Sequence, residues 1–277
     1  MNTTTFIKKQ GKVIIAGAGP GDPDLITVKA AQWLQRAEVV ITDRLVSPVL
    51  LKRYVSKNTL ICRVGKQGGC GASVSQSRIN DLIVFYAKQG KLVVRLKGGD
   101  ATLFSNILDE LQILVSLGIE YEIVPGITAA SGAAAYSGIP LTARGYAQSV
   151  RYLTCHRLRD WTESIWGELA RTEDTLVFYM SSENLEQIVD NLISAGIEKD
   201  KGLAIIEQAS TPFQHVVNCS IEDFEKRRAY ESIISPAIIV IGRVAVLNSH
   251  FSWMPDNCER KNYFEQLEDK KENYARA

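Results

Sequence analysis

Five polar or glycine-rich segments each follow an apolar run typical of a buried strand. They are GAGPGD (17–22), Asp43-Arg44, Gly65-Lys66, KGGD (97–100) and PGITAA (125–130). Glycines let a backbone turn tightly and approach a ligand closely, and a positioned carboxylate can accept a proton. Ligands of open α/β sheets bind beyond the carboxyl ends of the strands. We therefore expect the five segments to share one edge of a sheet and to form a site there.

The first three segments also have plain structural interpretations. GAGPGD has GxGxG rather than GxGxxG spacing, and Pro20 offers no backbone N–H, so a dinucleotide site is disfavoured and a simple turn stays open. Asp43 can accept a proton, or it can cap a helix or pair with Arg44. Lys66 can contact a carboxylate or donate a proton, or it can be a solvated surface lysine.

The last two segments suit a ligand that carries an amino-acid group. Backbone groups at Gly98 and Gly99 can reach such a group, and Asp100 can accept hydrogen bonds from its ammonium. The alternative is a glycine turn in which Asp100 caps the next helix. Thr128 and Ala129 are small enough to leave room for a flat ligand, although small residues there can equally allow tight helix packing at a domain junction.

Alternating strand-like and helix-like segments must position these loops. Continuous apolar runs separated by amphipathic stretches indicate an α/β fold with a parallel sheet covered on both faces. In the first half we expect strands at 12–17, 38–42, 59–64, 91–96 and 120–124. The second half repeats the alternation more loosely, with an antiparallel strand at 214–220. The predicted domains are residues 12–138 and 139–250, with flexible tails at 1–11 and 257–277.

The composition limits the classes of function. The 277 residues suit two domains, and the net charge of +1 provides no strong field to attract nucleic acid or a membrane. Five cysteines without CxxC spacing and three scattered histidines favour neither a disulfide framework nor a metal site. With no signal-peptide pattern and no apolar run of about 18 residues, we expect a soluble, cytoplasmic protein.

Taken together, these residues resemble the uroporphyrinogen-III C-methyltransferases of the tetrapyrrole methylase family. The matching segments include VIIAGAGPGDPDLITVKA (13–30), VVITDRLVS (39–47), VVRLKGGD (93–100), the long run from Val124 to Arg151, TLVFYM (175–180) and SPAIIVIGRVAVL (235–247). The resemblance implies two α/β domains with the active site in the cleft between them, and a homodimer. It also implies methylation of uroporphyrinogen III at C2 and C7 to give precorrin-2, for sirohaem or cobalamin biosynthesis.

The resemblance also implies roles for individual residues. It assigns Asp43 as proton acceptor and Lys66 as proton donor, with S-adenosylmethionine as cofactor and S-adenosylhomocysteine as its product. The residues implied for the cofactor are Pro20, Gly98, Gly99, Asp100, Leu103, Thr128, Ala129, Met180 and Ala209.

The substrate implied by the resemblance carries eight carboxylates, and bidentate arginine pairing suits their recognition. The candidate residues in or beside the matched segments are Arg44, Arg144, Arg151 and Arg157, together with Lys66. Some of these would be ordinary surface residues under the alternative interpretation.

Three other functions stay open. A sister methylase could act on a later precorrin, and a nicotinamide-dependent oxidoreductase is a more distant alternative. The segment 101–108 departs from the pattern common in the family, which leaves a non-catalytic cofactor- or tetrapyrrole-binding protein as the third.

Overall fold

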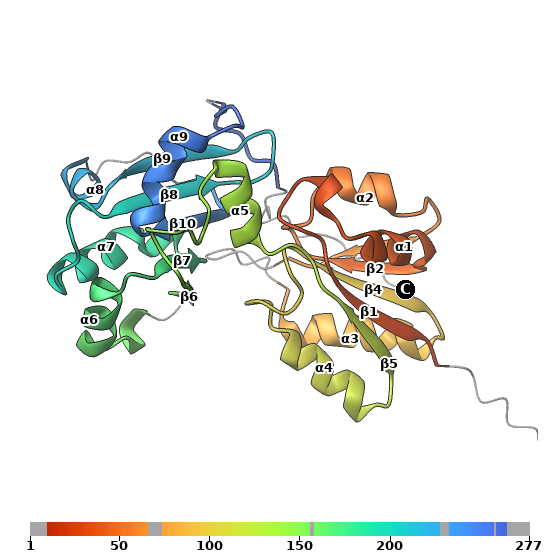
Figure 1. The fold of residues 1–277 in the computed structure, drawn as a ribbon. Helices are drawn as coiled ribbons and strands as arrows, with labels where there is room; N and C mark the ends of the chain where they lie inside the picture. The colour runs from red at the N-terminus through yellow and green to blue at the C-terminus, as the bar shows by residue number, and fades with distance from the viewer. Residues whose placement is uncertain (1–9, 66–73, 156–157, 228–232, 258, 265–277) are drawn as a thin grey trace, which may run out of the picture. The chain divides into compact units, whose positions relative to one another are not determined.

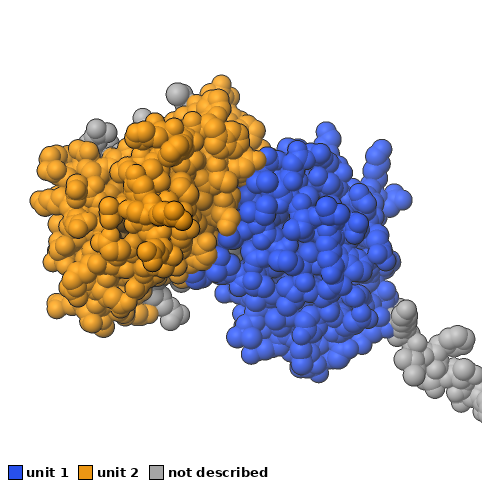
Figure 2. Space-filling model, viewed as in Figure 1, with its two compact units in different colours: residues 1–128, 264–277 blue, residues 129–263 orange. Residues whose placement is uncertain are grey.

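The chain folds into two compact units, each built on one sheet. The computed structural model describes residues 10–65, 74–155, 158–227, 233–257 and 259–264. The first unit comprises residues 1–128 and 264–277, and the second comprises residues 129–263 (Figure 2). Each sheet is covered by helices, so the predicted α/β fold class is confirmed (Figure 1).

The first unit contains a five-stranded sheet with the strand order β3-β2-β4-β1-β5. Every neighbouring pair in this sheet is parallel. The strands are β1 (Lys12–Gly17), β2 (Val39–Thr42), β3 (Leu60–Arg63), β4 (Leu92–Lys97) and β5 (Glu120–Val124). Because all five strands run in the same direction, the segments that follow them emerge at one edge of the sheet.

Helices cover both faces of this sheet. One face carries α1 (Val28–Arg36) and α2 (Pro48–Tyr54), and the other carries α3 (Gln76–Lys88) and α4 (Ile107–Ser116) (Figure 1). The helices α1, α2 and α3 begin after a threonine or serine whose hydroxyl accepts a hydrogen bond from a backbone N–H three residues later, which satisfies one free donor of the first turn. The helical spacing of apolar residues in 24–37 predicts one helix there, but Pro23–Leu25 forms a separate 3-10 turn and α1 begins at Val28.

The second unit contains a mixed five-stranded sheet with the order β6-β7-β10-β8-β9. The pair β6·β7 is parallel, whereas β10 runs antiparallel to both β7 and β8, and β9 antiparallel to β8 as expected for 214–220. The strands are β6 (Val150–Thr154), β7 (Thr175–Tyr179), β8 (Gly202–Glu207), β9 (His215–Ser220) and β10 (Ala237–Ile241). Since β7 and β8 both run against β10, their carboxyl ends lie at the same edge.

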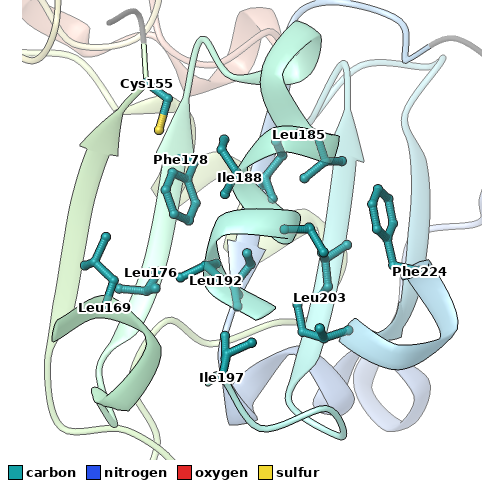
Figure 3. Packing of buried hydrophobic residues seen from close by; sticks show 14 of the residues in the cluster. Cys155, Leu169, Leu176, Phe178, Leu185, Ile188, Leu192, Ile197, Leu203 and Phe224 are labelled. Carbon is teal, nitrogen blue, oxygen red and sulfur yellow. The ribbon is translucent and has the colours of Figure 1, made fainter. Parts of the chain in front are cut away.

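A large apolar core lies on one face of the second sheet. Phe178 and Leu176 of β7 face Ile188 and Leu192 of the helix α7, and Leu203 of β8 extends the same layer (Figure 3). The helices of this unit are α5 (Ala129–Ser137), α6 (Glu163–Arg171), α7 (Leu185–Ser194), α8 (Ile221–Arg227) and α9 (Asn248–Phe251), with 3-10 turns at Leu158–Asp160, Ser182–Asn184 and Arg243–Leu247. The short helices α8 and α9 were not predicted from the sequence.

The boundary between the units falls between Thr128 and Ala129, whereas the predicted boundary follows residue 138. The difference is the helix α5, which belongs to the second unit. The backbone N–H of Ala130 donates to the Tyr179 hydroxyl at 3.0 Å, and the Asn248 side-chain amide donates to the Ser137 carbonyl at 2.7 Å. These contacts tie both ends of α5 to the second unit, and neighbouring residues in the sequence do not reveal them.

The predicted flexible tail from residue 257 needs a correction, because residues 257 and 259–263 belong to the second unit and are bound beside the end of β8. Arg260 forms an ion pair with Glu207 at 2.9 Å, and the Gln208 side chain donates to the Lys261 carbonyl at 2.8 Å. The same amide side chain accepts from the Tyr263 backbone N–H at 2.7 Å. Arg260 and the backbone of residues 261 and 263 therefore have specific partners in the second unit. None of the helices in the described part of the chain combines the length and apolar character needed to cross a membrane.

Candidate active site

Four glycines, Gly17, Gly19, Gly99 and Gly126, bring the segments at the ends of β1, β4 and β5 into direct backbone contact. A Cβ atom added at Gly126 would lie 2.4 Å from the Gly99 carbonyl oxygen and 2.9 Å from the Cα atom of Gly17. Gly19 and Gly99 also exchange backbone hydrogen bonds of 3.1 and 2.8 Å. The loops can approach this closely only because these positions lack side chains. The glycines of GAGPGD and KGGD thus join the loops to one another at the carboxyl edge of the first sheet.

The carboxylate of Asp100 fixes this junction. Its Oδ1 atom accepts a hydrogen bond from the Thr102 backbone N–H at 2.7 Å, and its Oδ2 atom accepts one from the Gly126 backbone N–H at 2.9 Å. Burial alone would raise the pKa of Asp100, but hydrogen bonds from Thr102, Gly126 and Leu103 outweigh it and hold the pKa below its ordinary value. Asp100 is therefore an ionised link between two loops, in addition to being a candidate ligand for an ammonium group.

Asp43 lies at the same edge, directly after β2. Its Oδ1 atom accepts a hydrogen bond from the Leu45 backbone N–H at 3.2 Å, and its Oδ2 atom accepts one from the Gly98 backbone N–H at 3.4 Å. The Nη2 atom of Arg95 lies 3.8 Å from Oδ2, and a quarter of the Asp43 side chain remains exposed. The carboxylate is thus held in place by backbone donors and a buried cation, with part of its surface open.

A hollow of about 190 Å³ opens beside Asp43 and is lined only by residues of the first unit. Four residues predicted for the site line it: Asp43, Arg44, Gly98 and Leu103. Burial lowers the pKa of Arg44, and the neighbouring Asp43 partly opposes that shift. Because Arg95 and Lys97 also line the hollow, it has more positive than negative groups and suits an anionic ligand.

Arg95, Lys97 and Glu110 form a buried ionic cluster beneath the hollow. Glu110 is fully buried, and its carboxylate lies 3.0 Å from Nε of Arg95 and 3.0 Å from Nζ of Lys97. Burial is the main cause of the lowered pKa of Lys97, followed by the nearby Arg95, while Glu110 and Asp43 oppose the shift. A single carboxylate thus neutralises part of the charge of two buried cations.

Sequence reasoning missed this cluster, although the sequence carries a signal for it. Arg95 and Lys97 alternate with apolar residues in VVRLK (93–97), within a strand predicted to be buried on both faces. A buried cation needs an anionic partner. Two cations in such a strand therefore predict a buried carboxylate on a covering helix, although they do not identify Glu110.

In the second unit, the segments after β7 and β8 lie at one edge. Met180 follows β7 with a left-handed φ of 53° and a 58% exposed side chain. Ala209 follows β8, and its neighbours Gln208 and Ser210 have φ angles of 46° and 62°. Non-glycine residues in this region of φ are uncommon and often accompany functional sites. The Tyr179 hydroxyl also binds the N–H of Ala130 in the first turn of α5, which brings Ala129 close to the end of β7.

Comparisons with known proteins place these features in a family. The sequence model of the Tetrapyrrole (Corrin/Porphyrin) Methylases matches residues 12–225. The chain belongs to this family. "Siroheme synthase 2" of Aeromonas hydrophila is 45% identical over 243 residues, which are 88% of this chain and 51% of that protein. The chain thus spans about half the length of the curated relatives that it matches.

Two solved structures extend the likeness to three dimensions. The cobalt precorrin-4 methyltransferase CbiF aligns with a TM-score of 0.74 and 28% identity, over 84% of this chain and 95% of CbiF. The uroporphyrin-III C-methyltransferase of Thermus thermophilus, solved with S-adenosylhomocysteine, aligns with a TM-score of 0.69 and 31% identity, over 84% of this chain and 93% of that chain. The two-unit fold is therefore that of the tetrapyrrole methylases.

The remaining basic residues predicted to contact the substrate of this tetrapyrrole methylase do not line the hollow beside Asp43 in the described part of the chain. Arg151, near the amino end of β6, forms ion pairs with Glu168 and Asp174, and these bonds raise its pKa. The structure therefore places Arg151 at the edge of the second sheet opposite to Met180. Arg144 is exposed in a turn closed by backbone pairing between Ala143 and Ala147. Lys66 and Arg157 lie outside the described residues.

Proposed function

We propose that this methyltransferase methylates uroporphyrinogen III at C2 and C7, using S-adenosylmethionine, and so produces precorrin-2. The observation that carries the proposal is the position of Asp43, a partly exposed carboxylate in a cation-lined hollow beside the joined glycine loops. The likeness to the Thermus thermophilus uroporphyrin-III C-methyltransferase, solved with S-adenosylhomocysteine, supports both the substrate and the cofactor.

The residues present fit an adenosyl cofactor with an amino-acid tail. At the glycine junction, backbone groups of Gly98 and Gly99 lie beside an ionised Asp100, and in the second unit Met180 offers an exposed apolar side chain. S-adenosylmethionine supplies an electrophilic methyl group when bound. The residues proposed to hold it are Pro20, Gly98, Gly99, Asp100, Leu103 and Thr128 of the first unit, and Ala129, Met180 and Ala209 of the second.

We assign Asp43 the role of proton acceptor. Methylation of a pyrrole carbon requires the loss of a proton elsewhere in the reduced ring system, and a positioned carboxylate can take it directly or through water. The backbone N–H groups of Leu45 and Gly98 hold the carboxylate, so its orientation is fixed before the substrate binds. Lys66 remains the proposed proton donor.

Charge in the hollow supports an anionic substrate. Arg44, Arg95 and Lys97 line the hollow, and among the described lining residues Asp43 is the one anion. Of the arginines predicted to bind substrate, Arg44 has the best-supported position. Arg144 is exposed, whereas Arg151 already has two carboxylate partners.

The direct test is anaerobic incubation with uroporphyrinogen III and labelled S-adenosylmethionine, followed by mass analysis of the product. We expect two methyl groups per tetrapyrrole. Asp43→Asn should retain affinity for S-adenosylhomocysteine and lose most of its turnover, while the exposed control Asp109→Asn should behave as the unmodified protein does. Full turnover by Asp43→Asn would remove that carboxylate from the mechanism, and binding without methyl transfer would favour a non-catalytic protein.

A sister methylase that acts on a later precorrin is the second candidate. The TM-score of 0.74 with the cobalt precorrin-4 methyltransferase CbiF is the observation in its favour. Product mass and the position of the new methyl group separate the two candidates.

We also propose a homodimer, which light scattering of the purified chain tests.

A further inference from the structure

Arg95 is the buried cation next to Asp43, and its guanidinium is held on three sides. Nε donates to Oε1 of Glu110 at 3.0 Å, and Nη1 donates to the carbonyl oxygens of Leu96 at 2.9 Å and Ile41 at 3.3 Å. Only 4% of Arg95 is exposed. These bonds leave Nη2 directed at Asp43, because the planar guanidinium has a rigid fork of donors.

The sheet register connects the two residues. Arg95 of β4 pairs with Ile41 of β2, which lies two positions before Asp43. Gly98, just after the same strand β4, donates its backbone N–H to Asp43. The same strand pair therefore sets the position of the carboxylate, of the cation and of the backbone donor.

The distance between the two groups indicates the kind of interaction. At 3.8 Å, the separation of Nη2 from Oδ2 is that of an ion pair rather than a short hydrogen bond. The directional contacts of Asp43 come from backbone N–H groups, whereas Arg95 contributes charge in a site that is largely buried. Such a charge attracts a neighbouring carboxylate oxygen and so helps to set its orientation.

The other charged groups around Asp43 are less well placed to take this role. Arg44 follows it in the chain and lines the hollow, so it faces the space that a ligand would occupy. Lys97 directs its ammonium at both oxygens of Glu110, each at 3.0 Å. Glu110 is an anion and holds the two cations of β4. Among the described groups, Arg95 is the one whose position is fixed by others and whose free nitrogen points at Asp43.

We propose that Arg95 is a positioning residue for Asp43: its guanidinium, held in place by Glu110, attracts the carboxylate and keeps it turned toward the hollow. The inference rests on the proposed role of Asp43 as proton acceptor. Arg95 takes no part in bond making. Its contribution is to maintain the orientation of the group that receives the proton.

Arg95→Lys and Arg95→Met test the proposal, with the exposed Arg53→Met as control. Lysine keeps the positive charge but lacks the planar set of guanidinium N–H donors, while methionine removes both the charge and the donors. We expect kcat for methyl transfer to fall about tenfold with lysine and about a hundredfold with methionine, with KM for uroporphyrinogen III changed by less than about threefold. Affinity for S-adenosylhomocysteine, measured by calorimetry, should stay within about twofold, which shows that the variants are folded.

The split between kcat and KM provides a readout that a purely structural role would not give. A misplaced Asp43 lowers kcat and leaves KM for uroporphyrinogen III nearly unchanged. A large rise in KM with unchanged kcat would overturn the proposal, because Arg95 would then bind the substrate itself. If Arg95→Met fails to fold, the kcat and KM of Arg95→Lys decide.

A double-mutant cycle separates this inference from the proposed function. If Arg95 acts through Asp43, Arg95→Lys should cause little further loss of kcat in the Asp43→Asn background. A full additional loss in that background overturns the role of Arg95 and leaves the proposed function intact. Absence of methyl transfer to uroporphyrinogen III by the unmodified chain, or full turnover by Asp43→Asn, overturns the proposed function and the inference with it.

Discussion

The Oδ2 atom of Asp100 accepts a hydrogen bond of 2.9 Å from the backbone N–H of Gly126. This bond joins the loop after β4 to the loop after β5, across the position of strand β1, which lies between these two strands. The two residues are 26 positions apart in the chain. Both belong to segments proposed to bind the cofactor, so this bond fixes the spacing of that part of the site.

Replacement of Asp100 by asparagine should loosen this link. An amide keeps one acceptor but loses the charge, and hydrogen bonds to charged groups contribute about 1.5–3 kcal/mol each. We expect the free energy of unfolding to fall by about 1–3 kcal/mol and the Kd for S-adenosylhomocysteine to rise about tenfold. Chemical denaturation and calorimetry measure the two effects.

The effect of Asp100→Asn should also depend on pH. The pKa of Asp100 lies below 3.8 in the folded protein, so its contribution to stability is present above pH 3.8 and is lost as the pH falls through the lowered pKa. The difference in stability between the two proteins should therefore shrink at acid pH. A difference that is constant from pH 7 to pH 3 would show that the charge of Asp100 has no part in the link.

Gly126→Ala should be strongly destabilising. Its Cβ would lie 2.4 Å from the Gly99 carbonyl oxygen, and the neighbouring atoms belong to backbones that cannot rotate away. We expect a loss of at least about 3 kcal/mol of unfolding free energy, together with weaker binding of S-adenosylhomocysteine. Gly118→Asn is the control, because it has open space and a φ of 64° that asparagine tolerates. Equal thermal midpoints for the two variants would contradict the close loop junction.

Glu110→Gln should destabilise the first unit by about 3–5 kcal/mol, since it leaves the buried Arg95 and Lys97 without their carboxylate. The free energy of unfolding in urea measures this effect. Glu222→Gln removes the carboxylate of an exposed ion pair with Lys226 and should leave the unfolding midpoint unchanged. A similar small effect for Glu110→Gln would mean that the two cations find other partners.

The buried thiol of Cys155 should make the free energy of unfolding depend on pH in the alkaline range. Burial raises the pKa of its thiol from 9.0 to about 11, with a smaller opposing effect of the bond to Ser181. The unfolded chain therefore loses this proton first, and the stability contribution present below pH 9 is lost between pH 9 and 11. Relative to Cys155→Ala, the unmodified chain should lose about 1.4 kcal/mol per pH unit in that range. If the free energies of unfolding of the unmodified chain and of Cys155→Ala changed with pH in parallel, the raised pKa of Cys155 would be contradicted.

The sequence located the strands of the first sheet well, because a parallel sheet buried on both faces requires continuous apolar runs. All five predicted strands are present, and their ends agree with the structure to within a residue. The helix predicted from residue 24 was less accurate, since a cap such as Thr27 competes with other starting points nearby. Fold class and loop order follow from local pattern, but element ends depend on individual hydrogen bonds.

The domain boundary shows the limit of local pattern. The boundary between the two units falls within the Gly- and Ala-rich stretch at 125–149. However, α5 has small and apolar residues on every side of the helix, so its own sequence does not indicate which unit it packs against. Its contacts with Tyr179 and Asn248 come from segments far along the chain, and only the folded structure brings them together.

By itself, the sequence determined the α/β class, the edge at which the loops after the strands gather, and the family through its motifs. Only the tertiary structure decided that Asp100 binds Gly126, that Arg151 is paired away from the Met180 edge, and that Arg95 faces Asp43. The physical reason is range: periodicity and turn chemistry act over a few residues. Charge pairing and backbone contact instead depend on which distant segments the sheet order places side by side.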